Sequence, residues 1–271
     1  MIRKLSVFCL LAVLCLTTTA QRVDTINIHS ASMNVDVRTV VILPKDYDGR
    51  KALPVLYLLH GYGGHHKTWI TVRPDLPETA TRMQMIVVCP DGRNSWYIDS
   101  PVRKDYKYET FMTAELPRAI DSLYATVAAP EGRAVTGLSM GGHGALRLGF
   151  LHPEVYGACG ATSGGVDLRP FPENWNLTEI LGARRDFPER WTEASAISHV
   201  DRIKPGLAII IDCGTSDFFY SVNEQLHKEL LYRNIGHEYT TRPGAHNGEY
   251  WANSIMHQLY FFDSFFARSG H

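Results

Sequence analysis

The sequence Gly-Leu-Ser-Met-Gly at 137–141 places a serine between two glycines. A short strand-like run at 133–136 precedes it, and a helical pattern follows at 144–148. A sharp turn from a strand into a helix strains the backbone of the central residue, and flanking glycines prevent clashes there. Such a turn presents the hydroxyl at a helix N-terminus, which favours developing negative charge. The pattern predicts that Ser139 is a nucleophile; the alternative is a purely structural Gly-Ser turn.

A serine hydroxyl is a weak nucleophile until a base takes its proton. His246 lies in the glycine-rich stretch 243–248, between an expected strand at 238–241 and the last helical pattern. Loops at the carboxyl edge of a parallel sheet often carry functional side chains, so we predict that His246 is the base. The other late histidines lie in helical patterns, at a strand start or at the terminus, and are His227, His257, His237 and His271.

An acid that follows another strand would accept the second imidazole N–H and orient the base. Two residues of this kind, Asp212 and Asp217, follow the apolar run at 207–211. Asp212 stands at the strand tip, where a carboxylate can also cap turn amides, whereas Asp217 lies further along the loop. Position alone favours Asp217 modestly and leaves Asp212 open.

A tetrahedral oxyanion requires two preorganised N–H donors. We expect one from Met140, directly after the serine, and the other from Tyr62 in the glycine-rich stretch 58–64. No carboxylate cluster accompanies the histidines of this region, so we do not expect them to bind a metal. These histidines are His60, His65 and His66.

Aromatic residues on loops after the expected strands are candidates for the wall of an acyl or aryl pocket, because aromatic rings offer large apolar area. Ordinary packing explains each of them at least as well. The candidates are Trp69, Trp96 and Tyr97.

Short strand-like runs alternate with helical patterns along the chain. Continuous apolar runs suit strands that are buried on both faces of a parallel sheet, so the alternation indicates an α/β fold with a mostly parallel sheet and helices on both faces. Residues 22–32 are expected to add antiparallel edge strands. The expected strands are 35–43, 53–59, 83–89, 133–136 and 207–211, and the helical stripes are 112–123, 222–230 and 251–266.

Two segments modify this pattern. Pro117 lies within the stripe at 112–123, and it should kink that helix or mark its real start. Residues 170–200 break the strand–helix rhythm and are read either as an insertion across the top of the sheet or as a plain surface excursion. No repeat or linker interrupts 21–271, which we interpret as one domain.

The 271-residue chain has 27 Lys and Arg against 28 Asp and Glu. It therefore lacks the surplus of basic residues that binding to nucleic acid or to an anionic membrane surface requires. A basic start, an apolar stretch at 5–16 and the small residues after it predict a cleaved signal peptide at 1–20. That stretch is too short for a membrane span, which needs about 20 residues, so we expect export without stable membrane insertion. The cysteines that remain show no disulfide or metal spacing and are expected to be buried; they are Cys89, Cys159 and Cys213.

Four segments together resemble the esterase D-like branch of the α/β-hydrolases, which includes tributyrin esterases, S-formylglutathione hydrolases, feruloyl and acetyl xylan esterases and, more distantly, the mycolyl transferases. The segment 213–218 is similar to the Cys-Gly-Thr-x-Asp acid motif of this branch, which implies that Asp217 rather than Asp212 is the acid. The resemblance also implies an α/β-hydrolase fold and a carboxylic ester hydrolase without a cofactor. After His246, Asn-Gly-Glu stands where many relatives carry a bulkier stretch. The segments are 58–64, 137–142, 213–218 and 243–246.

The expected function is a secreted or periplasmic serine carboxylesterase. It would act on short acyl, acetyl or feruloyl esters, including those on plant cell-wall polysaccharide, through an acyl-enzyme. The signal peptide argues against an S-formylglutathione hydrolase, whose thiol substrate is cytosolic. An acyltransferase of the mycolyl transferase type would share every catalytic residue, and a non-catalytic binding module on the same fold is the other alternative.

Overall fold

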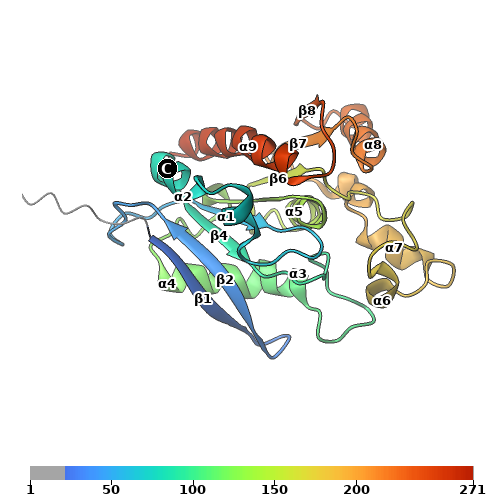
Figure 1. Cartoon of the computed structure of the whole chain (residues 1–271), viewed down its shortest axis with the longest axis horizontal. Helices are drawn as coiled ribbons and strands as arrows, with labels where there is room; N and C mark the ends of the chain where they lie inside the picture. The colour runs from blue at the N-terminus through green and yellow to red at the C-terminus, as the bar shows by residue number, and fades with distance from the viewer. Residues whose placement is uncertain (1–21, 271) are drawn as a thin grey trace, which may run out of the picture.

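One eight-stranded sheet runs through the computed structural model, which describes residues 22–270 (Figure 1). The strand order is β1-β2-β4-β3-β5-β6-β7-β8, in which β2 pairs antiparallel with β1 and β4 and the other neighbours are parallel. The predicted α/β-hydrolase fold with a mostly parallel sheet is confirmed. The strands are β1 (Arg22–Ser30), β2 (Val35–Leu43), β3 (Val55–Leu59), β4 (Ile86–Pro90), β5 (Arg133–Gly137), β6 (Ala158–Thr162), β7 (Ala208–Gly214) and β8 (Glu238–Arg242).

Helices pack on both faces of the sheet, and a separate hydrophobic core fills each side. Successive strand side chains point to opposite faces; in β3, Leu56 enters the core beneath α1, α2 and α9, and Tyr57 enters the core beneath α4, α5 and α8. In Figure 1, α9 lies along the upper side of the molecule and α4 along the lower side. The helices are α1 (Thr68–Val72), α2 (Leu76–Arg82), α3 (Tyr108–Thr110), α4 (Leu116–Leu123), α5 (Met140–Leu151), α6 (Leu177–Leu181), α7 (Pro188–Ala194), α8 (Tyr220–Tyr232) and α9 (Gly248–Arg268).

The inner strand β6 was not among the predicted strands. Its residues are small because α5 packs tightly against it, and a Cβ added to Gly149 would lie 2.5 Å from the Cβ of Cys159. Small side chains have little preference for strands. Residues 158–162 therefore form a strand because of their packing against α5, not because of their residue types. Pro117 lies in the first turn of α4, which continues the helical backbone of Tyr108–Thr110 and of the π-helical segment Phe111–Glu115. The proline therefore coincides with a change of helix type rather than with the start of the helix.

Residues 170–200 form α6, α7 and the start of the 3-10 helix Ala196–Arg202, between β6 and β7. Trp191 of α7 is fully buried, so this segment packs into the main core. Within residues 22–270, no helix combines the length and the apolar character that a membrane crossing needs. The signal peptide predicted at 1–20 lies outside the described residues. The three cysteines predicted to be buried are buried and free, and are Cys89, Cys159 and Cys213.

Candidate active site

Ser139 stands between the end of β5 and the start of α5, with φ 56° and ψ −117°. L-residues rarely adopt this backbone because of steric crowding. The glycines on either side permit the turn, since a Cβ on Gly137 or Gly141 would lie 2.6 or 2.4 Å from the carbonyl oxygen of Leu59. The turn places the Ser139 hydroxyl at the N-terminus of α5, as the glycine pattern predicted.

Ser139, His246 and Asp217 meet at the carboxyl edge of the sheet, because they follow the parallel strands β5, β8 and β7. Nε2 of His246 lies 2.9 Å from Oγ of Ser139, and Nδ1 lies 2.8 Å from Oδ2 of Asp217. The Asp217 side chain is fully buried, and that of His246 is 13% exposed. With Nδ1–H donated to the carboxylate, the lone pair of Nε2 faces the hydroxyl, which is the arrangement that a general base requires.

Asp212, the other candidate acid, has different partners. Its Oδ1 accepts hydrogen bonds from the hydroxyls of Thr162, at 2.8 Å, and Ser254, and its Oδ2 accepts from Nε2 of Gln258 at 2.7 Å. These partners lie on β6 and α9, so the Asp212 carboxylate joins α9 to the sheet. Position in the sequence favoured Asp217 only modestly over Asp212, and the structure brings Asp217 to the histidine.

Two backbone N–H groups are available beside the Ser139 hydroxyl. Within residues 22–270, the structure gives the N–H groups of Tyr62 and Met140 no hydrogen-bond acceptor. Gly61 brings the Tyr62 loop against the serine, since a Cβ on Gly61 would lie 3.2 Å from the Cβ of Ser139. A pair of free N–H donors at this point can bind a developing oxyanion.

Tyr97 fixes the position of this loop. Its hydroxyl accepts from the N–H of His60 at 3.1 Å and lies 3.2 Å from the carbonyl oxygen of the same residue, to which it can donate. Burial raises the pKa of Tyr97 well above its ordinary value, so the phenol keeps its proton. The loop backbone is therefore held at His60, two residues before the N–H of Tyr62.

The His60 imidazole is occupied by the backbone around it. Nδ1 donates to the carbonyl oxygen of Gly61 at 2.7 Å, and Nε2 accepts from the N–H of Gly92 at 2.8 Å. This tautomer uses both ring nitrogens and leaves neither as a metal ligand. In the described part of the chain, no cluster of three or more His, Cys, Asp or Glu residues is arranged to hold a metal ion.

The three aromatic residues predicted as pocket candidates are all buried, and two of them lie away from an open site. Trp69 is 1% exposed and donates its indole N–H to the carbonyl oxygen of Leu59 at 2.8 Å, on the face covered by α9. Tyr97 lies beneath the His60 loop. The prediction of a pocket wall is therefore wrong for Trp69 and Tyr97. Trp96 is also buried, but its ring packs against Trp175 with 5.2 Å between ring centroids.

Aromatic residues that the sequence analysis did not assign to the site surround His246. The Phe218 ring lies 4.2 Å from the imidazole and is 53% exposed, and Trp251 lies 5.0 Å from the imidazole. Trp175, from the segment 170–200, lies 6.1 Å from Phe218. The position of Phe218 directly after Asp217 is a signal that could have found it, whereas Trp175 reaches the site only through tertiary packing.

Residues 30–262 match the family model described as "Putative esterase". The chain belongs to this esterase family. The acetyl esterase of Caldicellulosiruptor saccharolyticus is 26% identical over 85% of this chain and 94% of its own length. Esterase Rv1288 of Mycobacterium tuberculosis (strain ATCC 25618 / H37Rv) is 31% identical over 76% of this chain, which spans only 51% of that relative.

Solved structures of esterases have the same fold as this chain. A ferulic acid esterase is 27% identical with a TM-score of 0.78, over 91% of this chain and 98% of that chain. The S-formylglutathione hydrolase of Staphylococcus aureus is 19% identical with a TM-score of 0.80, over 90% of this chain and 99% of that chain, and at this identity it shows the fold alone. The protein is accordingly an esterase, and the contacts of Ser139 with His246 and of His246 with Asp217 are those of a serine hydrolase.

Proposed function

We propose that the protein is an exported carboxylesterase that works through an acyl-enzyme on Ser139. The observation that carries the proposal is the 2.9 Å distance between Oγ of Ser139 and Nε2 of His246, whose Nδ1 is held by Asp217. His246 takes the hydroxyl proton as oxygen attacks the ester carbonyl, and it then gives this proton to the leaving alcohol. Water deprotonated by His246 hydrolyses the acyl-enzyme in the second half of the reaction.

The negative charge of each tetrahedral intermediate falls on the former carbonyl oxygen. The N–H groups of Tyr62 and Met140 are free to donate to it, and the N-terminus of α5 adds a favourable dipole. Donors of this kind are fixed before the reaction begins, so they stabilise the charge without reorganisation.

The acyl group is proposed to be acetyl or feruloyl, on a plant cell-wall glycan. The exposed ring of Phe218 lies beside His246, and the half-buried ring of Trp175 lies beside Phe218. These two rings offer flat apolar surfaces for an aromatic acyl group. One relative is named an acetyl esterase and one solved neighbour a ferulic acid esterase. Export, proposed from the sequence of residues 1–20, would bring the enzyme to such polymers.

A substrate panel tests this proposal. Nitrophenyl acetate, butyrate and ferulate, together with acetylated xylan, are assayed with the wild-type protein and with Ser139→Ala. The variant is expected to lose activity by about 10³-fold or more, and comparable turnover by both proteins would contradict the mechanism. Formation of acylated sugar instead of free acid when a sugar acceptor is added would identify an acyltransferase.

A further inference from the structure

A cavity of about 440 Å³ lies beside the C-terminal half of α5, away from the Ser139 site. This volume is in the range of small-molecule sites, roughly 300–1,000 Å³. Its walls come from the loop after β4 and from α6 and α7, which follow β6. Both segments therefore leave the sheet at the edge where Ser139 lies. Apolar wall positions include Ile98, Pro101 and Leu181.

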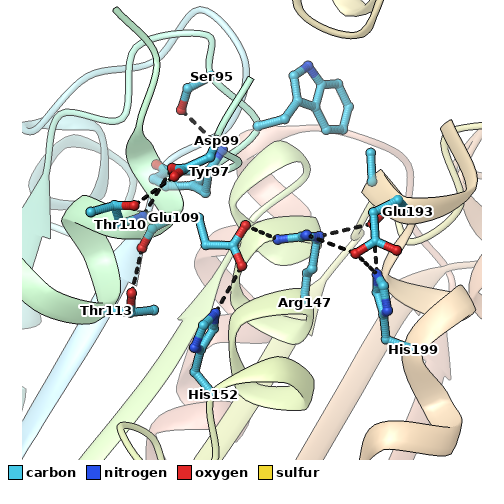
Figure 2. A network of polar contacts seen from close by, with 12 residues as sticks. Ser95, Tyr97, Asp99, Glu109, Thr110, Thr113, Arg147, His152, Glu193 and His199 are labelled. Carbon is cyan, nitrogen blue, oxygen red and sulfur yellow. Dashed lines mark hydrogen bonds and ion pairs between the residues drawn. The ribbon is translucent and has the colours of Figure 1, made fainter. Parts of the chain in front are cut away.

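Arg147 lies in the wall of this cavity, and its cationic side chain is only 7% exposed. Nη1 donates to Oε2 of Glu109 at 2.6 Å, and Nε donates to the carbonyl oxygen of Glu193 at 3.3 Å. Figure 2 shows the guanidinium between these two residues. Among the described residues, Nη2 has no hydrogen-bond acceptor, and it lies 3.9 Å from Oε1 of Glu193. The Nη2 group therefore remains free to donate a hydrogen bond to a ligand oxygen in the cavity.

The gap between Arg147 and Glu193 fits a hydroxyl group. At 3.9 Å the two side chains are too far apart for a direct hydrogen bond, but a hydroxyl can accept from Nη2 and donate to the carboxylate at the same time. The Glu193 side chain is 66% exposed, so it can move to improve this geometry.

The charges around the cavity disfavour an anionic ligand. Arg147 is already paired with Glu109, and the acidic side chains on the cavity wall outnumber the basic ones. A carboxylate or phosphate would therefore meet like charge, whereas a neutral ligand with several hydroxyls would find both donors and acceptors. The acidic wall residues are Asp99, Glu189 and Glu193, and the basic ones are Arg147 and Arg190.

The cavity lies about two turns of α5 beyond the nucleophile. Arg147 follows Ser139 by eight residues, which corresponds to about 12 Å of helix rise. Ala194 of the cavity wall accepts a hydrogen bond from Nε2 of His143 at 2.7 Å, one helical turn after Ser139. We propose that this cavity binds a neutral saccharide unit of the glycan whose ester group reaches Ser139. This inference rests on the proposed function, specifically on a glycan-linked substrate.

Binding is tested with Ser139→Ala protein, so that no hydrolysis intervenes. Xylotetraose, cellotetraose and trigalacturonate are titrated by calorimetry and by amide NMR. A neutral tetraose is expected to bind and to shift signals at 98–101 and 188–194. Adding Glu193→Ala should weaken binding about tenfold through loss of one charge-assisted hydrogen bond. Pro101→Trp, at an exposed wall position, should obstruct the cavity and abolish binding.

Glu131→Ala, which removes an exposed acid in the turn Pro130–Gly132, is the matched control and should leave the affinity unchanged. Absence of binding by both neutral tetraoses, equal affinity in Pro101→Trp, or a preference for trigalacturonate would overturn the inference. Failure of the proposed function is a separate outcome, because it appears as nitrophenyl acetate hydrolysis that does not depend on Ser139.

Discussion

Oδ2 of Asp217 lies 2.8 Å from Nδ1 of His246. Asp212, on the same strand end, is instead enclosed by hydroxyl and amide donors from β6 and α9. One strand end thus supplies two carboxylates in different environments, one that orients the imidazole and one that braces the core. Substitutions that keep the side-chain shape can separate these two functions.

Asp217→Asn is expected to lower kcat by about 10³–10⁴-fold, because an amide NH₂ facing Nδ1 favours the wrong imidazole tautomer. The melting temperature should change by only a few degrees. Steady-state kinetics on nitrophenyl acetate and a thermal scan measure the two effects. The matched control Asp212→Asn should instead lower the free energy of unfolding by about 1–3 kcal/mol, with a much smaller effect on kcat. The opposite pattern would reassign the acid to Asp212.

Tyr97→Phe removes the hydroxyl that contacts both backbone polar groups of His60. We expect kcat to fall about tenfold with little change in KM, because the oxyanion loop acts mainly in the transition state. Tyr232→Phe, at a side chain that is 83% exposed, is the control. An unchanged kcat in a folded Tyr97→Phe protein would show that the loop needs no such support.

Phe218→Ala removes the exposed ring beside His246. Loss of one aromatic contact of about 1 kcal/mol corresponds to roughly a fivefold increase in KM for nitrophenyl ferulate. Nitrophenyl acetate has no aromatic acyl group and should be much less affected, so the ratio of the two KM changes is the measured quantity. Equal changes for both esters would remove Phe218 from acyl recognition.

The Glu109 carboxylate contacts Arg147 of α5 and His152, which directly follows α5 (Figure 2). Burial alone would raise the pKa of Glu109, but the hydrogen bond from His152 and the charge of Arg147 outweigh burial and lower the pKa to about 2. The hydrogen bond with Glu109 raises the pKa of His152. The Glu109 contribution to stability is therefore complete above its ordinary pKa near 4.5 and is lost as the pH falls toward 2. The His152 contribution is complete below its ordinary pKa of 6.5 and is lost as the pH rises through its raised value.

Glu109→Gln should lower the free energy of unfolding by about 3–5 kcal/mol at pH 6, since it removes the closer and more buried of the two carboxylates that face Arg147. Urea unfolding at pH 6 and pH 3 measures this loss. The difference between variant and wild type should shrink at the lower pH, because below pH 4.5 the Glu109 carboxylate takes up a proton when the chain unfolds, whereas in the folded protein its pKa of about 2 keeps it ionised. A difference that is the same at both pH values would contradict the paired charge.

Local sequence patterns were sufficient for Ser139 and His246, because the glycines that permit their turns are neighbours in the chain. The choice between Asp212 and Asp217 needed the path of the histidine loop, or the family motif, since both acids follow the same strand. Trp175 reaches Phe218 only through the packing of 170–200. Such contacts join residues far apart in sequence, and no local periodicity encodes them.

The fold shows the same limit at β6. The strands with β-branched runs were predicted to within a few residues, and β2 matches 35–43 in full. Strand Ala158–Thr162 consists of small residues that fit beneath α5, so its place in the sheet follows from packing rather than from strand preference.

The central claim is that one activated hydroxyl carries the reaction, and covalent labelling tests it most directly. The protein is treated with diethyl nitrophenyl phosphate, digested and mapped by mass spectrometry while residual esterase activity is followed. We predict a single diethylphosphoryl group on Ser139, loss of activity in proportion to labelling, and labelling at least 10³-fold slower in His246→Ala. Labelling of another serine with loss of activity, or full activity after Ser139 is labelled, would contradict the account.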